Sequence, residues 1–388
     1  MSVRGKDQLG GQAAIVGIGA TEFSKDSGRS ELKLAVEAVH TALDDAGLSP
    51  SDVDGLVTFT MDTNPEITVA QAAGMGELSF FSRVHYGGGA ACGTVQQAAL
   101  AVASGVADVV VCYRAFNERS GRRFGSGVQH REPSAEGAAL GWNLPFGLLT
   151  PASWVAMVAQ RYLHTYGLTP EAFGHVAVTD RKYAATNPAA YFYEKPITLA
   201  DHAESRWIVD PLRLLDCCQE TDGGQAIVVT SVERARDLPN PPAVIRAAAQ
   251  GAGRAQEQMT SFYRDELTGL PEMSVVAQQL WRTAGLGPDG IDVGILYDHF
   301  TPFVLMQLEE FGFCAPGEAA GFVAEERLPL NTHGGQLGEA YLHGMNGIAE
   351  GVRQVRGTAV NQIPGAATAL VTAGTGVPTS GLILGADG

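Results

Sequence analysis

The sequence is poor in charged residues and contains no pattern typical of nucleic-acid-binding or membrane proteins. Only 18% of the 388 residues are charged, and 42 acidic residues against 26 basic ones give a formal net charge of −16. Nucleic acids and anionic membranes are bound through clustered basic residues, so we expect the chain to bind neither. There is also no uncharged apolar run of about 18 residues, the length that a membrane-spanning helix would need.

Cysteine is scarce and irregularly spaced. The sequence has five cysteines and no CxxC pair. An odd number without such pairs fits neither a disulfide framework nor a zinc site, so we expect no metal and a reducing compartment. Residues 1–19 lack the long apolar segment of a signal peptide. These features favour a cytoplasmic protein. The cysteines are Cys92, Cys112, Cys217, Cys218 and Cys314.

Glycine and apolar residues, in contrast, are abundant. The chain has 48 glycines without any period, and 45% of its residues are hydrophobic. This composition is typical of an α/β enzyme with many tight turns and close backbone approaches. The length predicts two domains, or one large pseudo-symmetric unit with an ample core.

A helix-to-strand connector occurs twice. Residues 46–54 and 284–292 agree at six positions (Ala, Gly, Leu, Pro, Val or Ile, and Asp) without a gap. Each copy follows a segment with helical spacing, and each precedes an apolar strand, at 55–59 and at 293–297. Chance reuse of a common connector is the alternative, but the matched flanking elements favour an internal duplication.

Glycine-rich turns support the duplication. The turn at 87–89 opens a predicted helix at 90–103, and the turn at 334–335 precedes a predicted helix at 344–355. Both halves therefore follow the same order of strand, helix, strand, glycine-rich turn and helix.

The duplication sets the predicted domain organisation. We place the N-terminal half at residues 1–250 and the C-terminal half at 251–388. Residues 115–210 are rich in aromatic side chains and show no clear period, so we expect an irregular insertion that forms a lid or loop domain.

Four motifs together resemble the thiolase superfamily over nearly the whole chain. Residues 331–335 (Asn-Thr-His-Gly-Gly) resemble the thiolase Asn-x-x-Gly-Gly turn, and residues 340–347 lie over the Gly-His-Pro motif. Residues 296–300 (Leu-Tyr-Asp-His-Phe) lie over the His-Asp-Cys-Phe motif of sterol carrier protein-type thiolases, and residues 215–224 resemble the segment before the last strand of the N-terminal half. The resemblance implies an α/β fold of five αβαβα layers, with two pseudo-symmetric halves and an inserted loop domain.

The sequence departs from this pattern at the catalytic positions. Ala90 stands where a thiolase has its nucleophilic cysteine, Tyr341 replaces the catalytic histidine, and Ala373 and Gly374 lie where the second cysteine is expected. Cys92 is two residues further along the predicted helix and points about 200° away. We interpret Cys92 as a packing residue, although a thiolase that uses it stays an alternative. An acyl-enzyme intermediate has no evident attachment point.

The chemistry that remains is the stabilisation of an enolate beside a thioester. If the substrate carries a β-hydroxyl group, loss of its proton expels the enolate and leaves a ketone, which is a retro-aldol cleavage. Tyr297 and Tyr341 could supply the base and the acid. A free phenol has a pKa of about 10, so one phenol would need a lowered pKa from donors or positive charge. His299 and His343 are the nearest candidates in the sequence.

The remaining candidates lie in the same motifs. Asp298 is expected to orient a neighbour or cap a turn, and we count it with the two tyrosines, His299 and His343 as a candidate catalytic residue. His333, Gly334, Gly335 and Gly374 are candidate substrate-binding residues, the glycines because they allow a sharp turn or a close approach to the thioester.

Loss of the cysteine together with paired tyrosines resembles the thiolase-like aldolases of bacterial steroid side-chain degradation, the lipid-transfer-protein group. This resemblance implies cleavage of a 17-hydroxy steroid 20-carboxyl-CoA to a 17-ketosteroid and propanoyl-CoA, with no cofactor in this chain. It also implies a homodimer and a small partner of the zinc-ribbon/OB-fold class. The aromatic insertion would suit a flat apolar substrate. A catalytically inactive acyl-CoA or sterol carrier is the other alternative.

Overall fold

The computed structural model describes residues 9–121, 123–126, 141, 143–257, 259, 262, 264–375 and 379–387. Its strands are β1 (Ala13–Ala20), β2 (Gly55–Phe59), β3 (Phe80–Val84), β4 (Val109–Asn117), β5 (Trp207–Val209), β6 (Leu212–Arg213), β7 (Asp222–Ser231), β8 (Ala243–Gly251), β9 (Val293–Ile295), β10 (Thr368–Ala373) and β11 (Thr379–Ala386). Its helices are α1 (Glu31–Ala46), α2 (Glu66–Ala73), α3 (Ala91–Ala103), α5 (Pro151–Tyr166), α6 (Glu171–Thr186), α7 (Leu199–Glu204), α8 (Val232–Ala235), α9 (Pro271–Ala284), α10 (Thr301–Glu310), α11 (Ala319–Ala324), α12 (Gly335–Gly338) and α13 (Met345–Arg356).

One large sheet runs through both halves in the order β3-β2-β4-β7-β1-β8-β11-β10-β9. From β1 outwards the pairings are antiparallel to β7, antiparallel to β4 and parallel to β2. From β8 outwards the same sequence of pairings leads to β11, β10 and β9. The two halves join where Ala14 and Ile15 pair with Val244 and Ala243. The sheet therefore has the predicted pseudo-symmetry. β8, which precedes the expected boundary after residue 250, pairs with β11 along its length.

The duplicated connectors have the same conformation and the same contacts. Gly47 ends α1 and Gly285 ends α9, each with φ 67° and ψ 29°. The Asp54 carboxylate accepts hydrogen bonds from the backbone N–H groups at the start of β4, and the Asp292 carboxylate does the same for Ala367 and Thr368 before and at the start of β10. Each aspartate thus fixes the register of its β-strand pair, and the internal duplication is confirmed.

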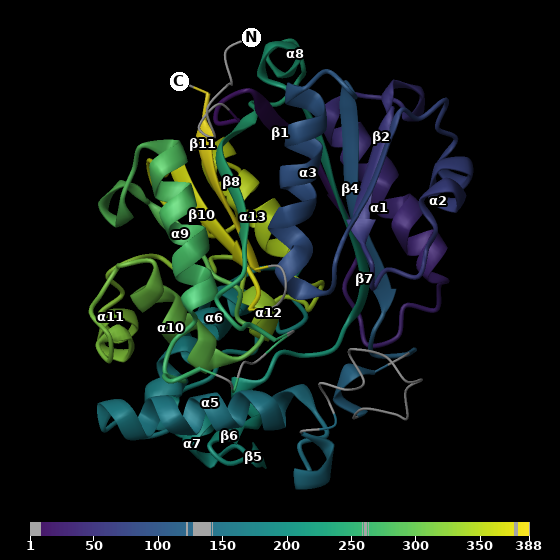
Figure 1. The fold of residues 1–388 in the computed structure, drawn as a ribbon. Helices are drawn as coiled ribbons and strands as arrows, with labels where there is room; N and C mark the ends of the chain where they lie inside the picture. Colours follow the sequence, from purple (N-terminus) through teal and green to yellow (C-terminus); the bar gives the residue numbers. More distant parts are fainter. Residues whose placement is uncertain are drawn as a thin grey trace.

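The helices and strands form five layers around three hydrophobic cores. The outer core of the first half lies between α1, α2 and the sheet, and the outer core of the second half lies between α9, α10, the insertion and the sheet. The central core packs α3 and α13 between the inner faces of both halves. Figure 1 shows α1 and α9 on opposite sides, with α3 and α13 between the strands. This is the expected αβαβα arrangement.

The insertion contains the helices α5, α6 and α7, which corrects the expectation of a wholly irregular segment. Thr150 caps α5 and precedes Pro151, while Gly167 ends the helix in the left-handed conformation. These start and stop residues are visible in the sequence, but the many aromatic residues obscured the helical period. Parts of the insertion, including Trp142, lie outside the described residues. Across the described chain, no helix has the length and apolar character needed to cross a membrane.

We predict that Asp54→Ala and Asp292→Ala destabilise the fold to a similar degree. Each change removes a carboxylate that satisfies backbone N–H groups of a neighbouring strand, so each should lower the free energy of unfolding by about 1 kcal/mol. Urea denaturation of both variants measures this. A loss confined to one variant would contradict equivalent roles in the two halves.

Candidate active site

Two tyrosines from different motifs meet, one buried (Tyr297) and one partly buried (Tyr341). Tyr297 follows β9, and Tyr341 lies in the turn between α12 and α13. The Tyr297 hydroxyl donates a hydrogen bond to the Tyr341 hydroxyl at 3.1 Å, with the ring centroids 6.4 Å apart. Tyr297 is only 3% exposed. The structure thus brings together the two phenols that the sequence proposed as base and acid.

Glycines make room for the Tyr297 ring at the start of α3. A Cβ atom at Gly88 would lie 1.9 Å from the Tyr297 hydroxyl oxygen, and one at Gly344 would lie 3.0 Å from the ring. Gly88 belongs to the turn that leads through Ala90 into α3. The phenol hydroxyl therefore lies beside the helix start, where the helix dipole favours negative charge.

Neither phenol is acidic in this site. Burial raises the pKa of both Tyr297 and Tyr341 well above the usual phenol value. The two histidines do not supply the expected positive charge: burial lowers the pKa of His299 to about 3, and burial together with Arg114 lowers the pKa of His343 well below its usual range. Both imidazoles are uncharged at neutral pH, so the site holds two neutral phenols rather than a resting tyrosinate.

A buried ion pair supports His343 from β4. Arg114 is fully buried, and its guanidinium lies 3.3 Å from the Asp62 carboxylate. The same guanidinium contacts His343 Nδ1 at 3.2–3.3 Å. Because Nδ1 accepts this hydrogen bond, the neutral ring carries its hydrogen on Nε2. The His343 ring packs at 4.8 Å from the Tyr341 ring. Sequence reasoning missed Arg114, although a single charged residue inside an apolar strand could have indicated it.

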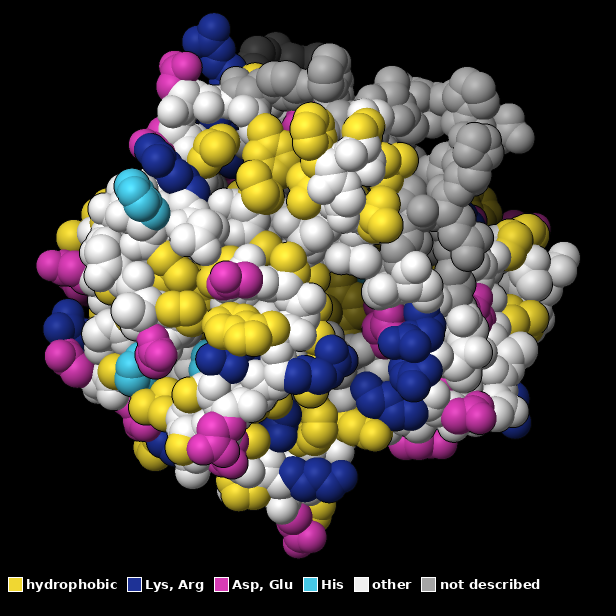
Figure 2. All heavy atoms as spheres, turned by 90° about the horizontal axis from the view of Figure 1, so that it is seen from below, with side chains coloured by type: hydrophobic (Ala, Val, Ile, Leu, Met, Phe, Trp, Pro, Cys, Tyr) yellow, Lys and Arg dark blue, Asp and Glu magenta, His cyan; other side chains and the backbone are white. Residues whose placement is uncertain are grey.

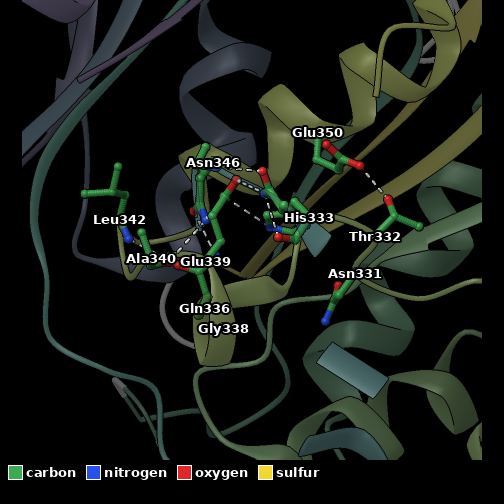
Figure 3. A network of polar contacts seen from close by, with 12 residues as sticks. Asn331, Thr332, His333, Gln336, Gly338, Glu339, Ala340, Leu342, Asn346 and Glu350 are labelled. Carbon is green, nitrogen blue, oxygen red and sulfur yellow. Dashed lines mark hydrogen bonds and ion pairs between the residues drawn. The ribbon is translucent and has the colours of Figure 1, made fainter. Parts of the chain in front are cut away.

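Polar side chains hold the backbone on both sides of Tyr341 (Figure 3). The Gln336 amide oxygen accepts hydrogen bonds from the N–H groups of Leu342 and Gly344. The Asn346 amide, in turn, donates to the carbonyl of residue 340 at 3.1 Å. On the far side, Thr221 Oγ1 accepts the Tyr341 N–H at 2.8 Å. Gln336, Asn346 and Thr221 are thus positioning residues for the phenol.

His333 belongs to a second network rather than to the phenol pair. Its Nε2 lies 3.9 Å from a Glu339 carboxylate oxygen, and Glu339 also accepts hydrogen bonds from Asn187 and Asn346. Burial lowers the pKa of His333 to about 3 and raises the pKa of Glu339 to about 7. Figure 3 shows the side chains of His333, Glu339 and Asn346 close together. A role for His333 in substrate binding stays a prediction.

Asp298 and the neighbouring glycines shape the turn before α12. The Asp298 carboxylate accepts hydrogen bonds from the N–H groups of Gln336 and Leu337, so its two oxygens face α12. Of the two roles expected for Asp298, capping is the one that these contacts show. A Cβ atom at Gly335 would lie 2.1 Å from Asp298, and one at Gly334 would overlap Ala184 of α6. The glycines therefore allow close packing as well as the turn.

Gly374 follows β10 with φ 112°, a conformation that favours glycine. Its part in substrate binding stays a prediction. No group of three histidine, cysteine, aspartate or glutamate side chains that could hold a metal ion occurs within the described ranges.

Comparison with known proteins places the chain in a family. The thiolase C-terminal domain-like family matches residues 253–385. A steroid side-chain-cleaving aldolase of Thermomonospora curvata is 69% identical over 98% of this chain and 99% of its own length. A 17-hydroxy-3-oxo-4-pregnene-20-carboxyl-CoA lyase of Mycobacterium tuberculosis is 67% identical over 97% of this chain and 100% of its own length.

The chain belongs to the thiolase-like steroid side-chain aldolases.

Solved structures agree with this family. The Ltp2-ChsH2(DUF35) aldolase matches with a TM-score of 0.94 and 68% identity, over 98% of this chain and 99% of that one. Human mitochondrial 3-ketoacyl-CoA thiolase matches with a TM-score of 0.70 at 15% identity over 97% of this chain and 99% of that one, which shows the shared fold alone.

The aldolase family assignment agrees with the environment of Cys92. Cys92 is fully buried in the central core, and its thiol contacts the carbonyl oxygen of Val371 at 3.7 Å. Burial raises the pKa of this thiol, the opposite of what a nucleophile at a helix start requires. These contacts fit the packing role that the sequence suggested and disfavour a thiolase that uses Cys92.

We predict that iodoacetamide leaves Cys92 unmodified in the folded aldolase. A buried thiol with a raised pKa forms almost no thiolate for alkylation. Peptide mass spectrometry after labelling at neutral pH measures this, and labelling in urea serves as the control in which Cys92 must react. Rapid native labelling of Cys92 would revive the thiolase alternative.

Proposed function

We propose that this chain catalyses the retro-aldol cleavage of a β-hydroxyacyl-CoA, namely a 17-hydroxy steroid 20-carboxyl-CoA, to a 17-ketosteroid and propanoyl-CoA. The observation that carries the proposal is the contact between the Tyr297 and Tyr341 hydroxyls, in a fold where Cys92 is fully buried and burial raises the pKa of its thiol. The names of the two relatives at 69% and 67% identity support the same reaction and substrate class.

The phenol pair can transfer the required proton although neither phenol is ionised before the substrate binds. The Tyr297 oxygen takes the proton of the substrate hydroxyl while the Tyr297 proton moves to the Tyr341 oxygen. The carbon–carbon bond breaks, its electron pair passes into the thioester as an enolate, and the hydroxyl carbon becomes a ketone. As Tyr341 receives the Tyr297 proton, it gives its own proton to the carbon next to the thioester, so no doubly protonated phenol forms. Both phenols end neutral, with the Tyr341 hydrogen now being the former Tyr297 hydrogen.

This relay follows from the raised pKa values of both phenols. A base that had to exist as a free tyrosinate would be rare at neutral pH, because burial raises both pKa values well above 10. In a hydrogen-bonded pair the two transfers are coupled, so neither phenol has to ionise before the substrate binds. The start of α3 beside the Tyr297 hydroxyl favours the negative charge that develops as the bond breaks.

The surface of the insertion supports a large apolar acyl-CoA. Figure 2 views the molecule from the insertion end and shows hydrophobic side chains gathered there, with a hollow that has Lys and Arg side chains along one side. An apolar steroid and an anionic CoA would find matching surfaces on this face. Among the described residues of the insertion, the exposed large hydrophobic side chains are Leu144, Phe146, Leu149, Met157, Tyr193, Leu199 and Trp207.

We further propose that the chain works as a homodimer bound to a small partner of the DUF35 type, with a zinc ribbon and an OB fold. The name of the Ltp2-ChsH2(DUF35) aldolase includes a DUF35 component, which supports a partner of this type. The dimer is proposed from the thiolase fold. Five cysteines without a disulfide support a reducing compartment, and we propose the cytoplasm.

Product identification tests the reaction. The chain and its partner should convert a 17-hydroxylated steroid 20-carboxyl-CoA to equimolar 17-ketosteroid and propanoyl-CoA, without consuming free CoA. Liquid chromatography with mass spectrometry measures both products. Recovery of tightly bound but unchanged thioester would instead favour the carrier alternative, and consumption of free CoA would favour a thiolase.

Conservative changes test the phenols separately. We expect Tyr297→Phe and Tyr341→Phe each to lower kcat by about 10²–10⁴-fold with a small effect on KM, because each removes one member of the proton relay. Tyr162→Phe is the matched control. This buried tyrosine lies in the insertion, and its hydroxyl donates a hydrogen bond to the Glu309 carboxylate of α10 at 2.5 Å. Near wild-type turnover in either active-site variant would refute the relay.

A further inference from the structure

Glu118 is a buried carboxyl group in the turn that directly follows β4. At the end of this strand, Asn117 still pairs with Asp222. Asp222 is next to Thr221, whose hydroxyl oxygen accepts the Tyr341 N–H, so this pairing places Glu118 near the turn that holds Tyr341.

The Glu118 side chain is not compensated as a buried carboxylate would need to be. It is 1% exposed, and Oε2 has no hydrogen-bond partner among the residues that the structure describes. The neighbouring Asp222 shows the contrast. Its carboxylate accepts hydrogen bonds from the N–H groups of Ser27, Arg119 and Ser120 and from the Ser120 hydroxyl. A buried carboxyl without such donors is more stable as the neutral acid.

The charged groups around Glu118 divide into two sets. Arg114 and Lys25 favour its anion, while Glu220 and Asp222 oppose it. Burial outweighs all of them and raises the Glu118 pKa well above its usual range.

The Glu118 carboxyl group in turn acts on the phenols, because a negative Glu118 raises the pKa of both Tyr297 and Tyr341. A negative Glu118 also raises the pKa of the Cys218 thiol, which burial already raises well above its usual value.

We propose that Glu118 is a positioning residue of the reaction: held as a neutral acid beside the phenol pair, it keeps the site free of charge, and its ionisation stops turnover. The inference rests on the proposed retro-aldol function. Its physical basis is the burial of the Glu118 side chain, the lack of a partner for Oε2 within the described chain, and the pairing of the adjacent Asn117 with Asp222, next to the Thr221 that holds the Tyr341 backbone.

The direction of the pH effect follows from the chemistry of the relay. An anionic Glu118 would repel the enolate and make any transfer of charge to the phenols more costly. Because burial raises the Glu118 pKa, the neutral acid persists to higher pH than an exposed carboxyl group would, so activity is present below that pKa and falls above it. The phenols themselves ionise later, since their pKa values lie well above 10. The first alkaline loss of kcat/KM therefore belongs to Glu118.

The test compares pH profiles of wild type and Glu118→Gln. Glutamine keeps the shape and the neutrality of the protonated acid. We expect the variant to stay within about threefold of wild-type kcat/KM at neutral pH and to lack the alkaline loss, which in wild type approaches about tenfold per pH unit. An unchanged alkaline loss in the variant overturns the proposal. So does a natively folded variant that is more than about a hundredfold impaired at every pH.

Lys25→Met distinguishes Glu118 from its titrating neighbour, because burial lowers the pKa of Lys25 to about 8. If Glu118 carries the alkaline loss, removal of the lysine charge moves the loss to higher pH. If Lys25 carries it, the loss disappears in Lys25→Met and persists in Glu118→Gln, which overturns the proposal.

An infrared measurement is independent of turnover. The difference spectrum of wild type minus Glu118→Gln at neutral pH should contain the C=O band of a protonated carboxylic acid. Carboxylate bands in its place would overturn the proposal. If wild type forms no ketosteroid but shows the protonated band, the proposed reaction fails while the neutral state of Glu118 stands.

Discussion

The 3.1 Å contact between the Tyr297 and Tyr341 hydroxyls is the interaction around which the site is built. Both phenols belong to the second half: Tyr297 directly follows β9, and Tyr341 lies in the turn between α12 and α13. The space for Tyr297 comes from Gly88 in the first half. Gln336 and Thr221 fix the backbone next to Tyr341. Small errors in any of these contacts would separate the two oxygens, and a proton relay depends steeply on donor–acceptor distance.

The duplicated architecture explains how this geometry arises. In each half an aspartate, Asp54 or Asp292, fixes the start of a neighbouring strand, and a glycine-rich turn leads into a central helix. The two central helices, α3 from the first half and α13 from the second, share one core with strands of both halves. The start of α3 and the turn before α13 therefore meet in the same place, and the insertion covers that place from one end (Figure 1). Two similar halves thus create one asymmetric site.

Much of this arrangement follows from local sequence, and the rest depends on long-range contacts. The Ala-Gly-Leu-x-Pro connector marked the duplication, and motif positions marked Tyr297 and Tyr341. The expected charge state of the site was wrong, since burial, which no local pattern reveals, makes His299 and His343 neutral. Glu118 was missed for a related reason. Its importance comes from a three-dimensional property, an Oε2 atom without a hydrogen-bond partner among the described residues, and residue spacing carries no record of that.

In the proposed reaction, neutral phenols on a thiolase scaffold move protons and no thiol attacks the substrate. A structure of the protein with a bound, uncleavable β-hydroxyacyl thioester analogue tests this most directly. We predict that the analogue's hydroxyl lies within hydrogen-bond distance, about 3 Å, of the Tyr297 oxygen, with the carbon next to the thioester facing the Tyr341 hydroxyl. An analogue that binds with both phenols out of reach, or with its thioester against Cys92, would contradict this mechanism.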